Sequence, residues 1–161
     1  MCKIKLSTLL LISFFLVSCS AQKKYNTSNT FNLGRIESDV EGLVAHNILS
    51  SHLNSFGLLN GLSHYKISGK INHATSLYIT NIDNTSDREN VITTLYITIV
   101  KDACVVYKYE EETSQFYLIT SSTKFKSNTK AIEKIKYDNS ENLIQRFINI
   151  IIDKPLNCID E

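Results

Sequence analysis

Four histidines, the residue type best suited to metal binding and to acid–base chemistry near neutral pH, occur at His46, His52, His64 and His73. His46 and His52 are six residues apart on a predicted helix, so they face in nearly opposite directions. His64 and His73 flank a predicted strand and approach each other only if the next strand folds back in a suitable register. Because a zinc site needs three or four converging ligands, the sequence predicts solvated or locally hydrogen-bonded histidines and no metal site.

Nucleophilic side chains are present, but their spacing does not suit nucleophilic catalysis. Ser51-His52 and Ser63-His64 place a hydroxyl next to an imidazole in sequence, and adjacent side chains point apart on a helix or a strand. The sequence also lacks G-x-S-x-G, H-E-x-x-H, G-x-x-x-x-G-K-[ST] and G-x-G-x-x-G, and it has five glycines in all. We therefore expect no enzymatic activity and no cofactor.

Two groups of acidic residues resemble binding loops only superficially. Asp83, Asp87 and Glu89 could suggest calcium, but their loop lacks the EF-hand glycine and carries Arg88, so a solvated hairpin loop is predicted. Glu110 to Ser114 is predicted as a turn whose charges discourage pairing at the sheet edge.

Five lysines gather late in the chain, at Lys124, Lys126, Lys130, Lys134 and Lys136. This spacing is typical of an exposed strand face, although the cluster could also attract an anionic glycan, a lipid headgroup or an acidic partner. The formal net charge of the whole chain is only +1. Such a balance argues against nucleic acid as a partner.

The N-terminal segment has the charge order of an export signal. Lys3 and Lys5 precede an apolar run from Leu6 to Val17, which is shorter than the ~20 residues that a membrane-spanning helix needs. Removal of this segment would lower the net charge to about −1, because it carries two lysines and no acid.

The run ends in Leu16-Val17-Ser18-Cys19, which resembles the lipobox of bacterial lipoproteins. The resemblance implies cleavage before Cys19 and a diacylglyceryl group on its thiol, so that covalent lipid would hold the protein on a membrane. It implies three parts: a signal peptide (1–18), the lipidated cysteine with a polar tether (19–33) and one globular domain (34–161). In some enterobacterial lipoproteins an acidic residue directly after the lipidated cysteine retains the protein in the inner membrane. The residue here is Ser20, so we expect the protein at the outer membrane, on either its periplasmic or its surface side.

Two cysteines remain for the folded domain, Cys104 and Cys158. In an oxidising envelope compartment they could pair, and otherwise they would be two free buried thiols. The sequence leaves both alternatives open, but it contains no C-x-x-C motif and so favours a structural role.

Helical patterns occur at both ends of the domain. Apolar residues recur at helical spacing over 39–56, after a capping-box pattern at Ser38 and Glu41 and before a left-handed stop at Gly57. A second helix is predicted from a cap at Asp138 to Pro155. The segment Lys130–Tyr137 before it fits either a sixth strand or a helical lead-in.

Between these helices, five β-branched and aromatic runs predict strands over residues 65–71, 76–82, 90–100, 103–109 and 115–125. A polar break at 72–75 and turns at 83–89, 101–102 and 110–114 separate them. The sequence therefore predicts an α+β fold: an N-terminal helix, an antiparallel meander of about five strands and a C-terminal helix, in a two-layer sandwich. Tyrosines on an uncovered sheet face would form a binding surface.

Together these features predict a lipid-anchored cell-envelope protein that acts as a binding or accessory module. Its partners would be the membrane, through Cys19, and an envelope protein or glycan. One alternative is a carrier of a small apolar ligand between helix and sheet, and a weaker one is an envelope hydrolase without a recognisable motif.

Overall fold

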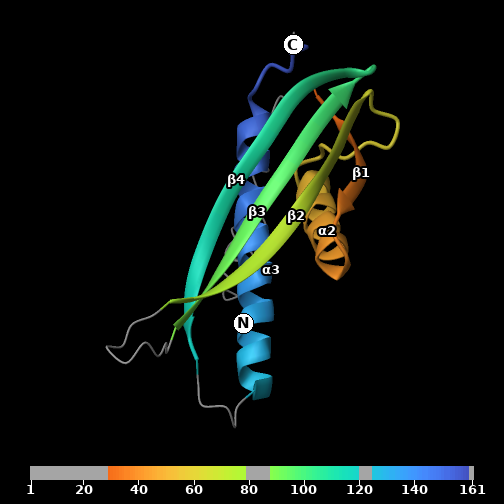
Figure 1. Cartoon of the computed structure of the whole chain (residues 1–161). Coiled ribbons are helices and arrows are strands. Elements are labelled where there is room, and N and C mark those ends of the chain that lie inside the picture. The colour runs from red at the N-terminus through yellow and green to blue at the C-terminus, as the bar shows by residue number, and fades with distance from the viewer. Residues whose placement is uncertain (1–28, 79–87, 120–124, 160–161) are drawn as a thin grey trace, which may run out of the picture.

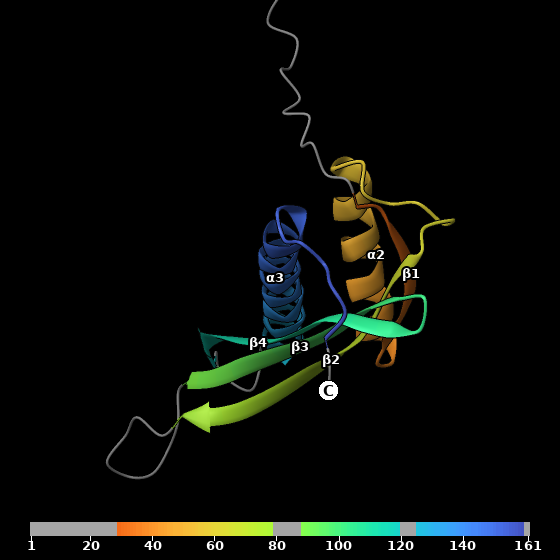
Figure 2. The same cartoon turned by 90° about the horizontal axis from the view of Figure 1, so that it is seen from above.

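The computed structural model of the chain describes residues 29–78, 88–119 and 125–159. Within these residues, β1 (Phe31–Glu37), β2 (Tyr65–Tyr78), β3 (Arg88–Lys101) and β4 (Cys104–Leu118) form one sheet in the order β1-β2-β3-β4. Helix α2 (Val40–Ser55) contacts β1 and β2, and α3 (Phe125–Ile152) contacts β3 and β4. Both helices lie on the same side of the sheet (Figures 1 and 2). The predicted α+β class is confirmed.

The strand count and pairing differ from the prediction. β2 joins the two strands expected over 65–71 and 76–82, because every residue from Tyr65 to Tyr78 pairs with β3 across the expected polar break. β4 likewise runs through 110–114, where Glu110 pairs with Tyr96 and Glu112 with Thr94. The polar residues that looked like breaks are therefore accommodated by partners on the neighbouring strand.

β1 is a strand that the sequence analysis did not predict, and it makes the sheet mixed. It runs parallel to β2, with Phe31 opposite Tyr65 and Glu37 opposite Lys70. Residues 31–33, expected in the tether, belong to this strand because Phe31 is only 1% exposed and packs in the core. A seven-residue strand with a glycine and an interrupted register has too weak an alternating pattern to be recognised by itself.

Helix α2 has the predicted position and the predicted end, but not the predicted cap. Its last turn closes with Gly57 at φ +69°, and the N–H groups of Gly57 and Leu58 donate to the carbonyls of Asn54 (3.0 Å) and Leu53 (2.8 Å). These two bonds form a Schellman motif. The capping box is wrong: the N-cap residue is Asp39, and its side chain makes no capping hydrogen bond.

Helix α3 begins thirteen residues before the expected cap at Asp138, so Asp138 and Glu141 lie inside it. The ambiguous segment Lys130–Tyr137 is helical, and the described lysines of the cluster lie on a helix and not on a strand face. Two buried polar residues, Asn139 and Ser140, interrupt the apolar stripe at this point. That interruption makes the middle of one helix resemble the start of another.

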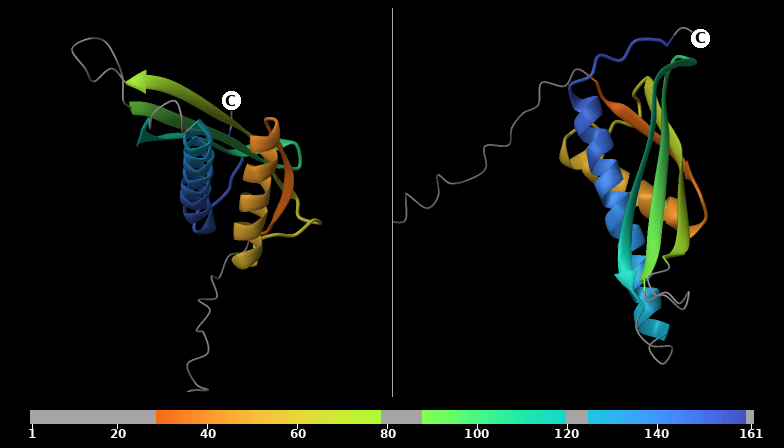
Figure 3. Two further views of the ribbon diagram at one scale, coloured as in Figure 1. Left: turned by 90° about the horizontal axis from the view of Figure 1, so that it is seen from below. Right: turned by 60° about the vertical axis from the view of Figure 1, so that its left-hand side comes forward.

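The core fills the space between the helices and the sheet. Its largest side chains, all less than 2% exposed, include Phe31, Leu49, Leu53, Ile67, Ile71, Leu95, Ile97, Ile99, Leu143 and Phe147. The alternation along β2 and β3 puts odd-numbered residues on the helix side. α3 extends past the first residues of α2 toward the end of the sheet where β2 ends and β3 begins (Figure 3). The sheet is therefore covered by two helices at one end and by α3 at the other.

After α3, the chain returns to the hairpin that joins β3 and β4. Leu156 is buried in the core, and the N–H of Ile159 donates to the carbonyl of Val105 (2.9 Å). The turn itself consists of Asp102 and Ala103, both with positive φ (48° and 73°), which is the backbone of a type I′ hairpin.

Candidate binding cleft

Polar and apolar groups together line a cleft between both helices and β2, which we call the His73 cleft. Its volume is about 430 Å³, and it opens to the surface. Its lining residues are Val40, Glu41 and Val44 from α2, His73 from β2, and Glu133, Lys136, Tyr137 and Ser140 from α3. The cleft lies where the first turns of α2 leave the middle of α3 and β2 partly uncovered.

A chain of hydrogen bonds fixes His73 at the inner wall of the cleft. His73 Nδ1 lies 2.8 Å from Thr93 Oγ1, and Asn139 Nδ2 donates to the same hydroxyl oxygen (3.2 Å) and to the Val91 carbonyl (3.2 Å). Thr93 and Asn139 are fully buried. The Thr93 hydroxyl proton is buried and needs an acceptor, and among the described residues His73 Nδ1 is the acceptor within reach. We therefore assign Thr93 as the donor of this bond and His73 Nδ1 as the acceptor. The imidazole is then neutral, with its proton on Nε2.

The electrostatics agree with a neutral imidazole. Burial lowers the pKa of His73, and the positive charge of Lys136 lowers it further, against a smaller opposing effect of Glu41. His73 therefore presents an N–H donor at neutral pH, and within the described chain its Nε2 has no hydrogen-bond partner. The sequence predicts a solvated or locally hydrogen-bonded histidine, and the bond to Thr93 agrees with the second alternative. The signal that the prediction missed is the register: His73 follows Ile67 and Ile71 on the helix side of β2.

An ion pair closes one side of the cleft. Lys136 Nζ lies 3.0 Å from Glu41 Oε1, and the two side chains are 29% and 36% exposed. The hydrogen bond from Lys136 holds the pKa of Glu41 below its usual range. The acid expected to cap α2 is therefore used to join α2 to α3.

The mouth of the cleft is apolar. Val40 is 72% exposed and Tyr137 is 47% exposed, although both are large hydrophobic residues. A shallower groove of about 360 Å³, lined by Val44, Asn47, Ile48, Ser51 and Tyr137, continues along the two helices. An exposed apolar rim beside a polar inner wall is typical of a binding site.

The other histidines do not converge with His73. His64 Nδ1 lies 3.1 Å from Asp102 Oδ1, and His52 Nε2 lies 3.9 Å from Glu141 Oε1. His46 lines a separate groove between β1 and α2. Residues 29–78, 88–119 and 125–159 contain no group of three or more metal-ligating side chains. Asp83 and Asp87 of the loop considered for calcium, and Lys124, lie outside the described residues.

The acidic segment of β4 also differs from its prediction. Glu111 is not in a turn: it accepts hydrogen bonds from the Tyr109 hydroxyl and from Arg146 Nη1 (2.5 Å), and these bonds lower the pKa of Glu111. Burial in turn raises the pKa of Tyr109. Most sheet tyrosines with described side chains face the helices, and Tyr96, which is 36% exposed, faces the other side of the sheet. The described side chains therefore do not form a tyrosine-rich outer face.

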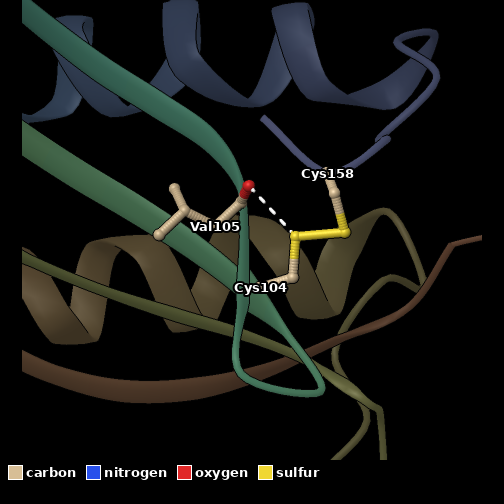
Figure 4. Close-up of a disulfide and its surroundings, with 3 residues drawn as sticks. All are labelled: Cys104, Val105 and Cys158. Carbon is tan, nitrogen blue, oxygen red and sulfur yellow. Dashed lines mark hydrogen bonds between the residues drawn. A yellow bond between two sulfur atoms is a disulfide. The ribbon is translucent and has the colours of Figure 1, made fainter. Parts of the chain in front are cut away.

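Of the predicted cysteine sites, one pair lies in the described chain. Cys104 at the start of β4 and Cys158 beyond α3 form a disulfide with a Cα–Cα distance of 5.8 Å (Figure 4). It holds the C-terminal segment against the β3–β4 hairpin. Cys19, the predicted lipid-attachment residue, lies outside the described residues.

Several solved structures have this fold. The rare lipoprotein B of Shewanella oneidensis matches with a TM-score of 0.56 and 10% identity, covering 78% of this chain and 98% of that one. A minor lipoprotein from Acinetobacter baumannii gives 0.57 and 11%, covering 82% and 95%. An uncharacterized lipoprotein B from Nitrosomonas europaea gives 0.58 and 7%, covering 74% and 79%. No family model and no curated protein matches the sequence.

These likenesses define the class of fold, which is one found in several bacterial lipoproteins. At such low identity they show the shared fold alone. In the described part of the chain, neither helix combines the length and the apolar character required to span a membrane.

Proposed function

We propose that this chain is a lipid-anchored protein of the cell envelope that binds another macromolecule as a binding or accessory module, without enzymatic activity. The observation that carries the proposal is the fold shared with three lipoproteins, since the same chain also has the lipobox ending at Cys19. Lipid on Cys19 would hold the domain at the membrane, and the outer membrane is the proposed location.

The His73 cleft supports a binding role. It combines an apolar mouth, a hydrogen-bond donor and an ion pair already neutralised within the chain. The hydroxyl–imidazole pair at its inner wall, Thr93 with His73, has a fully buried hydroxyl that a substrate would not reach. Of the residues paired in the sequence, Ser63 Oγ donates to the Thr30 carbonyl, and His64 pairs with Asp102. The partner that we propose is an envelope protein or a glycan.

Metabolic labelling with radioactive palmitate in a bacterial host tests the anchor. We expect label on the wild-type chain and on Cys2→Ala, and none on Cys19→Ala. Cys2→Ala is the matched control because it removes the other cysteine of the N-terminal segment. Label that persists in Cys19→Ala, or that is absent from the wild type, would disprove the lipid anchor.

Membrane fractionation on a sucrose gradient tests the location. We expect the labelled protein in the outer-membrane fraction. Recovery in the inner-membrane or soluble fraction would contradict this part of the proposal.

A further inference from the structure

We propose that the His73 cleft receives a large apolar side chain from an extended segment of a partner protein, whose backbone carbonyl accepts a hydrogen bond from His73 Nε2–H. This inference rests on the proposed binding role and gives the chemistry of the partner at this site. It follows from the charge, the donor and the shape of the cleft.

The charges of the cleft do not favour a small ion. Lys136 and Glu41 form a pair, so a free anion would have to compete with Glu41 for the ammonium group. Of the cleft's carboxylates, only Glu133 lies outside that pair, and its residue is exposed to solvent, where an isolated charge attracts a cation weakly. The cleft is therefore suited to a ligand without net charge.

The donor at the inner wall requires an acceptor from the ligand. His73 is half-buried, and the bond to Thr93 occupies Nδ1. The Nε2–H group can therefore still donate a hydrogen bond to a ligand. A buried N–H without an acceptor is unfavourable, and a neutral carbonyl satisfies it without bringing charge into the cleft. A peptide backbone supplies such carbonyls at regular intervals.

The shape accommodates a side chain together with its backbone. The volume of about 430 Å³ lies within the range of small-ligand pockets, and Val40, Val44 and Tyr137 provide its apolar wall. The adjoining groove beside Ile48 continues the apolar surface and could hold a neighbouring residue of the same segment. A phenylalanine or leucine anchor with its carbonyl toward His73 fits this arrangement.

An NMR titration of the full chain in lipid nanodiscs tests the inference. The probe is N-acetyl-phenylalaninamide, and the comparison compounds are N-acetyl-glycinamide, which lacks the side chain, and hexanoate, which is an apolar anion. We expect N-acetyl-phenylalaninamide to cause saturable shifts of the Val40 and Val44 methyl groups and of His73 Nε2. Empty nanodiscs correct for partition of each probe into lipid.

Two pairs of variants make the test specific. Val40→Ser should weaken probe binding about fivefold, because it removes apolar surface from the mouth. Leu43→Ser changes another well-exposed apolar residue of α2, outside the cleft, and should leave binding unchanged. His73→Phe, which removes the donor, should weaken binding about tenfold, whereas His64→Phe should not. Unchanged methyl signals of core Leu53 and Ile148 would show that each variant is folded.

Four outcomes would overturn the inference: no saturable shift, tighter binding of hexanoate, equal loss in Val40→Ser and Leu43→Ser, or full affinity in His73→Phe. Shifts of the same methyl groups that depend on protein concentration without any probe would instead assign the cleft to a second copy. Palmitate labelling tests the lipid anchor independently of this titration. A negative titration result therefore contradicts the proposed cleft ligand and leaves the proposed anchor unaffected.

Discussion

Lys136 Nζ of α3 lies 3.0 Å from Glu41 Oε1 of α2, and this ion pair bridges the two helices at the side of the His73 cleft. The helices are also joined by the contact between His52 and Glu141 and through the core beneath, where Leu49 and Phe147 are buried. The pair therefore sets how the first turn of α2 lies relative to α3. It also leaves the cleft without a free cation at this position.

Glu41→Gln should lower the free energy of unfolding by about 0.5–1 kcal/mol at pH 7, a small effect because both partners are partly exposed to solvent. The pKa of Glu41 is lowered in the folded state, so the stabilising contribution is present above about pH 4.5 and is lost as the pH falls through the lower folded value. Urea unfolding at several pH values measures this. The difference between wild type and Glu41→Gln should shrink in acid.

Glu133→Gln is the matched control, because Glu133 lines the same cleft on α3 and is exposed. We expect a change of less than about 0.5 kcal/mol. An equal effect of both substitutions would show that general charge, and not the pair with Lys136, is responsible.

The stability of the fold should also respond to His73 near neutral pH. The pKa of His73 is lowered in the folded state, so the unfolded chain binds more protons between the folded value and about 6.5. The stabilising contribution of neutral His73 should therefore be fully present above about pH 6.5 and should be lost as the pH drops from there through the folded value. His73→Gln should remove this dependence, and His64→Gln, which changes a well-exposed histidine, should retain it.

The tautomer of His73 can be measured directly. We expect ¹⁵N spectra at pH 7 to show a neutral ring protonated on Nε2, as the bond from Thr93 to Nδ1 requires. A proton on Nδ1 would contradict both this assignment and the proposed carbonyl contact.

Asn139→Ala should destabilise the chain by about 2–3 kcal/mol, because the buried amide satisfies the Val91 carbonyl and the Thr93 hydroxyl. Thermal or chemical unfolding measures the loss. Asn142→Ala, on an exposed position of the same helix, should change stability by less than about 0.5 kcal/mol. An unchanged free energy of unfolding in Asn139→Ala would mean that the hydrogen-bond network below the cleft does not stabilise the fold.

Loss of the disulfide should destabilise the oxidised chain by up to about 4 kcal/mol, the chain-entropy value for a closed loop of 54 residues. Cys158→Ser and Cys104→Ser should give similar losses in urea unfolding. A reducing agent should destabilise the wild type and leave both variants unchanged. Two titratable thiols in the purified wild type would show that the pair is not formed.

Ala103→Gly should stabilise the β3–β4 hairpin by about 1 kcal/mol, because Ala103 has φ 73° and glycine adopts this conformation without steric cost. Ala131→Gly inside α3 is the contrasting control and should destabilise by about the same amount. A loss of stability in both variants would indicate that the turn does not adopt positive φ at Ala103.

Several elements could be predicted from the sequence because their signals are local. The spacing of apolar residues and Gly57 identified α2 within one residue at each end. The β-branched and aromatic composition identified β2, β3 and β4, although not β1. The export-type run ending at Cys19 and the presence of only two further cysteines after it are likewise properties of the sequence alone.

The tertiary structure decided what depends on partners far away in the chain. Residues 72–75 and 110–114 are strand because Thr93, Thr94 and Tyr96 pair with them, and no local pattern contains that information. Phe31 begins a parallel strand because the core beside α2 buries it. Asn139 can lie buried inside a helix because Val91 and Thr93 accept hydrogen bonds from its side-chain NH2 group, although its Oδ1 has no partner among the described residues.

The His73 cleft also depends on residues that lie far apart in the chain. Glu41, His73 and Lys136 are separated by 32 and 63 residues, and each has an ordinary local explanation: a helix cap, a solvated or locally hydrogen-bonded histidine and a lysine on an exposed strand face. They form one cleft only when α2, β2 and α3 pack together. Local sequence determines which faces are apolar, whereas packing over long sequence distances decides which polar groups meet, because burial and hydrogen-bond partners are properties of the folded chain.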